Sequence, residues 1–99
     1  MDVIEPMVVA YGNILIRLFG VNSLKEKRSI VRSLVNDLRK QFEISVIESG
    51  RQDSKDYVLI GIAFATLNES DAEAKFDTIE NYVEGRYTIE EFTYDYHHF

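Results

Sequence analysis

The amino-acid sequence predicts an α+β domain with the element order βαββαβ. Four stretches are rich in β-branched and aliphatic residues, and two stretches have the three- and four-residue apolar spacing of amphipathic helices. Each helical stretch is preceded by a serine with a glutamate three residues later, the spacing of a capping box. The two middle β-stretches are separated by a short polar loop, which indicates a hairpin.

The first strand is expected over residues 7–19, where Ile14 and Ile16 share one face and Leu15 and Arg17 the other. Gly20 ends it. A helix over residues 23–41 follows, with Ser23 as the N-cap residue. Its predicted buried stripe consists of Leu24, Val31, Leu34, Val35, Leu38 and Phe42.

The hairpin is expected to join strands over residues 42–48 and 56–66 through the polar loop 49–55. In the second of these strands the alternation assigns Val58, Ile60, Ile62 and Phe64 to the core face. The opposite face is apolar but small, and it carries Tyr57, Leu59, Gly61, Ala63 and Ala65.

The second helix is expected to start at the capping box of Ser70 and Glu73 and to end at Gly85. Its predicted buried stripe consists of Ala72, Phe76, Ile79 and Val83. The last strand is expected over residues 87–96, with a β-bulge near Glu90 and Glu91 because Ile89 is out of phase with the following aromatic residues.

Two strand–helix–strand units joined by a hairpin predict a four-stranded antiparallel sheet with both helices on one face, which is the ferredoxin-like layout. The expected domain covers residues 7–96, between a flexible N-terminal arm over 1–6 and a tail over 97–99. A chain of 99 residues fits one such domain.

Composition excludes several classes of function. The chain has no cysteine, so disulfides and thiolate-ligated metals are excluded within it. Its first residues are acidic where a signal peptide is basic, and no apolar run approaches the roughly 20 residues of a membrane span. We therefore expect a cytoplasmic protein without a membrane partner.

The net charge of −6 is distributed unevenly. Residues 51–99 carry four basic and eleven acidic side chains, whereas residues 23–42 carry six basic and two acidic ones. One basic helix on an otherwise acidic chain is therefore expected.

Cations occupy the first turn of this helix, where the helix dipole opposes them. Lys25, Lys27 and Arg28 each cost typically about 0.3–1 kcal/mol at such positions. The hairpin loop and the turn at 85–87 lie at the same end of the predicted sheet. We predict that this end binds the phosphate groups of RNA, either as RNA alone or as part of the ribosome. Its expected cations are Lys25, Lys27, Arg28, Arg32, Arg51, Lys55 and Arg86.

The same cluster also has a structural interpretation. An acid of the neighbouring hairpin, Glu48, Asp53 or Asp56, would neutralise the cations, and we take Glu48 as the expected counter-ion. Lys27 is spaced to lie within the apolar arc with its ammonium group at the sheet edge. The protein would then be a protein–protein interaction or homodimerisation module.

A homodimer is expected because no helix remains to cover the second face of the sheet. Exposed apolar patches usually mark interaction sites. The side chains expected at the dimer contact are Leu15, Tyr57, Leu59, Ala63 and Ala65.

Three short runs of the sequence resemble the YlxP-like bacterial family, the domain of unknown function 503. They are Ser-Leu-Lys-Glu-Lys-Arg-Ser over residues 23–29, Ser-Val-Ile-Glu over 45–48 and Gln-Asp at 52–53. The resemblance implies a ferredoxin-like fold and a genomic association with ribosome-maturation and translation-initiation genes. It implies no settled activity. Many relatives carry a tryptophan two residues after the Gln-Asp pair, where this chain has Lys55.

Other patterns indicate no catalytic or metal chemistry. His97 and His98 are adjacent and would point to opposite faces of a strand, so we expect a frayed tail and no metal site. The phosphate loop of acylphosphatase has no counterpart over residues 19–22, and residues 56–62 do not match the RNA-recognition motif. The sequence thus predicts a non-enzymatic binding protein without a cofactor or an evident small-molecule ligand.

Overall fold

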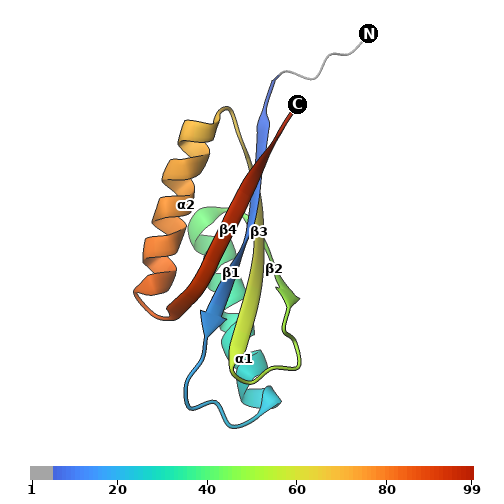
Figure 1. Cartoon of the computed structure of the whole chain (residues 1–99), viewed down its shortest axis with the longest axis vertical. Helices are drawn as coiled ribbons and strands as arrows, with labels where there is room; N and C mark the ends of the chain where they lie inside the picture. Colours follow the sequence, from blue (N-terminus) through green and yellow to red (C-terminus); the bar gives the residue numbers. More distant parts are fainter. Residues whose placement is uncertain (1–5) are drawn as a thin grey trace.

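The computed structural model of the protein describes residues 6–99 and has the predicted βαββαβ order (Figure 1). The elements are β1 (Val8–Arg17), α1 (Leu24–Phe42), β2 (Ser45–Gly50), β3 (Tyr57–Thr66), α2 (Glu69–Glu84) and β4 (Thr88–His98). The arm expected over 1–6 lies outside the described residues, apart from Pro6.

The four strands form one antiparallel sheet in the order β2-β3-β1-β4. The first strand of the chain therefore lies inside the sheet, between β3 and β4. Leu15 pairs with Glu91 while the next residue, Ile16, pairs with Ile89. The predicted bulge is thus confirmed, with Glu90 as the extra residue.

Both helices pack on the same face of the sheet, and the core lies between them and the strands. The predicted core residues of β3 are at most 8% exposed, and the stripe of α2 is fully buried around Phe76. Phe76 also contacts the rings of Phe92 and Tyr94 from β4. The ferredoxin-like prediction is confirmed, and the opposite face of the sheet, here called the open face, carries no helix.

The helix starts agree with prediction for α1 and differ for α2. The Ser23 hydroxyl accepts a hydrogen bond from the backbone N–H of Glu26, as a capping serine does. The capping box predicted at Ser70 is wrong, because α2 begins two residues earlier than expected. Its N-cap is Asn68, whose side-chain oxygen accepts from the N–H of Asp71 at 2.8 Å.

The ends of two strands also differ from prediction. Strand β2 starts at Ser45 rather than at residue 42, because α1 continues through Phe42 and ends at Glu43 in the left-handed conformation (φ 53°). The tail expected over 97–99 is wrong for His97 and His98, which continue β4 opposite Val9 and Val8. No helix within residues 6–99 is long and apolar enough to cross a membrane.

Candidate anion-binding surface on helix α1

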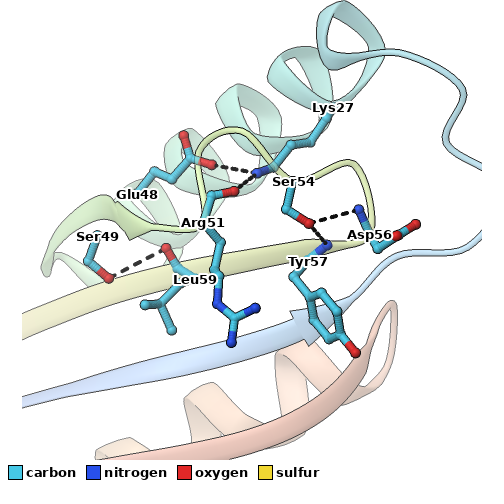
Figure 2. A network of polar contacts seen from close by, with 8 residues as sticks. All are labelled: Lys27, Glu48, Ser49, Arg51, Ser54, Asp56, Tyr57 and Leu59. Carbon is cyan, nitrogen blue, oxygen red and sulfur yellow. Dashed lines mark hydrogen bonds and ion pairs between the residues drawn. The ribbon is translucent and has the colours of Figure 1, made fainter.

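Lys27 is the one buried charged side chain in the described part of the chain, with 1% exposure. Its Nζ lies 3.1 Å from Oε2 of Glu48 in β2 and donates a 2.5 Å hydrogen bond to the backbone carbonyl of Arg51 (Figure 2). Lys27 is buried on the same side of α1 as Val31 and Leu34, as its spacing predicts. Glu48 is the acid that contacts it, whereas Asp53 and Asp56 form no ion pair within residues 6–99.

The Lys27 contact fixes the β2–β3 loop to the start of α1. Arg51, whose carbonyl accepts this bond, has a positive φ of 57°, and Ser54 then caps the loop by accepting from the N–H groups of Asp56 and Tyr57 (Figure 2). An ammonium group held by a carboxylate and a carbonyl has few donors left for an external anion. Lys27 is therefore unsuited to direct contact with phosphate.

Three other predicted cations remain at the surface of α1. Lys25, Arg28 and Arg32 are exposed, and among residues 6–99 no carboxylate lies within ion-pair distance of any of them. They line one hollow of about 540 Å³ together with Ser23, Glu26 and Ser29. The structure thus brings these three cations together on one side of the helix.

A groove of about 350 Å³ continues this surface between α1 and the edge strand β2. Arg28 and Arg32 line it on the helix side, and Ile47, which is 58% exposed, lies on the strand side. Arg39 closes its far end and donates to the carbonyl of Val46 at 2.7 Å. We call the exposed cations Lys25, Arg28, Arg32 and Arg39 the α1 cation row.

The remaining predicted cations lie elsewhere, which corrects the prediction of one cluster. Arg86 is bound to Asp37, in the C-terminal half of α1, at 3.1 Å and stacks on the Tyr82 ring. Lys55 is exposed in the hairpin loop and makes no ion pair within the described residues. Arg51 extends its guanidinium group over the open face of the sheet rather than toward α1 (Figure 2).

The open face carries an arginine that sequence reasoning did not single out. Arg17 donates a 2.8 Å hydrogen bond to the Tyr57 hydroxyl, and this bond raises the pKa of Arg17 above its usual value. The guanidinium groups of Arg17 and Arg51 lie 4.9 and 5.2 Å from the centroid of the same Tyr57 ring. The direct pairing of Arg17 with Tyr57 across β1 and β3 is the signal that could have revealed this contact.

All five residues of the expected dimer contact share the open face. Leu15, Tyr57, Leu59 and Ala63 are half-buried, and Ala65 is exposed. Tyr11, also on this face, is 44% exposed. Across residues 6–99 no three histidine, aspartate or glutamate side chains are grouped so that they could hold a metal ion.

Comparisons with known proteins give a family but no activity. The model of the family described as "Protein of unknown function (DUF503)" matches residues 9–96. The uncharacterized protein YlxP of Bacillus subtilis (strain 168) is 25% identical over 73 residues, which are 74% of this chain and 79% of that protein. The resemblance predicted from residues 23–29, 45–48 and 52–53 is therefore confirmed.

Proposed function

The chain belongs to the DUF503 family of unknown function, and we propose that it is a non-enzymatic protein that binds RNA through the phosphate backbone. The observation that carries this proposal is the α1 cation row. Lys25 and Arg28 at the start of α1, and Arg32 one turn further along it, are exposed and have no acidic partner within residues 6–99. Exposed cations without an ion-pair partner, gathered around one hollow, can bind the phosphate groups of a polyanion.

The placement of the cations supports phosphate over a structural role. Cations at the first turn of a helix oppose the macrodipole, so Lys25 and Arg28 weaken α1 slightly instead of stabilising it. A bound phosphate would reverse this cost, since it contacts the cations and is attracted by the same dipole. The structural demand for a counter-ion is met separately, by Glu48 for Lys27.

The acidic remainder of the chain supports one defined binding face. The net charge is −6 although α1 is basic, so a polyanion is repelled from most of the surface. Repulsion elsewhere would confine RNA to the α1 cation row. Three or four neutralised phosphates predict that log affinity for single-stranded RNA falls with log salt at a slope of about −2 to −3.

The test is fluorescence anisotropy with a labelled single-stranded RNA of mixed sequence, and with purified ribosomal subunits, at two or more salt concentrations. The double variant Lys25→Glu/Arg28→Glu should lower the affinity at least tenfold and should flatten the salt slope by about 1 or more. Both side chains are exposed, so unfolding is not expected.

A matched control is Lys40→Glu/Lys75→Glu, which makes the same change in net charge outside the α1 cation row. It should lower RNA affinity much less than Lys25→Glu/Arg28→Glu. Equal losses in the two double variants would show that binding follows net charge alone. A wild-type protein without salt-sensitive binding to either RNA or ribosomal subunits would refute the proposal.

A further inference from the structure

The open face of the sheet has a charge pattern that is complementary to a copy of itself. A row across all four strands contains Gly50 in β2, Leu59 in β3, Leu15 in β1 and Glu91 in β4, and Arg51 directly follows Gly50. The row follows from the register, in which Gly50 pairs with Leu59, Leu59 with Leu15, and Leu15 with Glu91. A cation and an anion thus flank two leucines.

These four side chains surround a hollow of about 240 Å³, which Asn13 and Thr93 also line. Arg51 and Glu91 form no ion pair with each other or with any other residue from 6 to 99. Both residues are exposed, and the Arg51 guanidinium group lies over the Tyr57 ring. The hollow therefore has one cation, one carboxylate and two leucines in its lining.

We propose that a second copy of this chain covers the open face, related by a twofold axis that runs parallel to the strands between β1 and β3. Rotation about this axis exchanges the two sides of the hollow. Arg51 of one copy then faces Glu91 of the other, and Leu59 faces Leu15, at both ends of the contact. This mutual exchange is the condition for an isologous interface.

Two rows on the Tyr11 side of the hollow fit the same axis by size, whereas the row on the other side pairs Arg17 with Tyr57. Tyr11 pairs with Ala63, and Asn13 pairs with Gly61, so β1 presents the larger and β3 the smaller side chain in each row. The rotation places Tyr11 over Ala63 and Asn13 over Gly61 of the second copy. Large side chains thus meet small ones, as face-to-face packing of two sheets requires.

The charges also select the direction of the axis. An axis perpendicular to the strands would place the β4 edges over each other and bring Glu91 near Asp95 of the second copy. This arrangement juxtaposes two carboxylates, whereas the axis parallel to the strands opposes Glu91 and Arg51, although it also sets Arg17 of one copy over Tyr57 of the other.

The size of the face indicates an interface at the small end of the specific range. Three strands of ten or eleven residues and one of six, about 4.8 Å apart, cover roughly 600 Å² per copy, or about 1,200 Å² in total. We therefore expect a reversible dimer with a micromolar Kd.

The test is sedimentation equilibrium of the full chain over about 1–300 µM, which brackets a micromolar Kd. Arg51→Glu alone and Glu91→Arg alone should each raise the Kd of self-association at least tenfold, since each substitution creates two like-charge contacts in the symmetric dimer. An equimolar mixture of the two variants should restore dimers with a Kd near that of the wild type. In the mixed dimer, unlike charges again oppose each other at both ends.

The mixing experiment distinguishes a charge pair between two copies from a charge pair within one copy, because neither variant restores the pair of unlike charges on its own. The substitution at residue 51 is compatible with its positive φ, as Glu43 adopts a similar conformation at 53°. Tyr11→Glu gives a second variant, which adds a charge to the dimer face and should also raise the Kd at least tenfold. The controls Lys40→Glu and Asp77→Arg are exposed on the helices and should leave the Kd unchanged, separately and mixed.

Three results would overturn the proposal. The first is a wild type that is monomeric at every concentration. The second is a single variant that dimerises as tightly as the wild type. The third is a mixture of the two variants whose Kd falls no more than that of the control mixture. The outcome is independent of RNA binding, since the α1 cation row lies on the other side of the sheet and is unchanged in all of these variants.

Discussion

Replacing Glu48 with glutamine tests the buried contact between α1 and β2. The substitution keeps the size of the side chain and removes its charge, so the buried Lys27 ammonium group keeps only neutral acceptors, the Arg51 carbonyl and the new amide oxygen, and loses its counter-charge. Removing one partner of a buried ion pair costs about 3–5 kcal/mol. Because the Glu48 side chain is 21% exposed and partly reached by water, we expect a smaller loss of about 2–3 kcal/mol for Glu48→Gln.

The opposite deletion, Lys27→Met, should cost less. Methionine preserves the buried apolar stem, and the Glu48 carboxylate that remains can be hydrated from its exposed side, so we expect a loss of about 1 kcal/mol or less. The double variant Lys27→Met/Glu48→Gln should be about as stable as Lys27→Met alone, since it no longer contains a buried charge.

The measurement is urea unfolding followed by circular dichroism, with the free energy of unfolding of the four proteins compared at constant m-value. If Lys27→Met proved more destabilising than Glu48→Gln, the loss would arise from packing around the lysine stem. The charge of Glu48 would then not be what stabilises the contact between α1 and β2.

Two further predictions concern a helix cap and a buried hydroxyl group. Asn68→Ala should lower the free energy of unfolding by about 1 kcal/mol, because the side chain of Asn68 caps α2. Ser70→Ala should change the free energy of unfolding by less than about 0.5 kcal/mol. Equal losses in the two variants would contradict the assignment of Asn68 as the cap. Burial, followed by the nearby charge of Glu73, raises the pKa of Tyr96 above its usual value. The folded protein thus holds this proton more tightly than the unfolded chain, so the contribution of Tyr96 to stability is complete below pH about 10 and is lost as the pH rises further. Tyr96→Phe should make unfolding less sensitive to pH above about 10 in denaturant titrations, and an unchanged alkaline transition would show that Tyr96 does not cause it.

The fold was predictable because each element has a clear period or boundary in the sequence. The alternation in β3 and the three- and four-residue spacing in α2 identify the buried faces directly, and Ile89 being out of phase predicts the bulge in β4. The start of α2 was less predictable, since Asn68 and Ser70 are both good capping residues two positions apart. Only the bond from Asp71 to Asn68 distinguishes them.

The site was predictable only where it depends on a single helix. Spacing along α1 places Lys25, Arg28 and Arg32 on one side and the stem of Lys27 in the apolar arc. The direction of Arg51 depends on its positive φ, and the pairing of Arg86 depends on Asp37, 49 residues away. Side-chain reach across loops and between elements is set by tertiary packing, which a one-dimensional pattern does not contain.

The central position of β1 also has a consequence for how the chain folds. β1 is made first, yet both of its partners follow later in the sequence, and its pairing with β4 joins Val8 to His98. Contacts between such distant residues require large loops to close before they gain stability, which slows folding. The hairpin of β2 and β3 can form early, but the sheet can be completed only when the last strand adds to the free edge of β1. Removing β4 would therefore expose the middle of the sheet and not merely shorten one side, so the C-terminal strand should control whether the whole domain is folded.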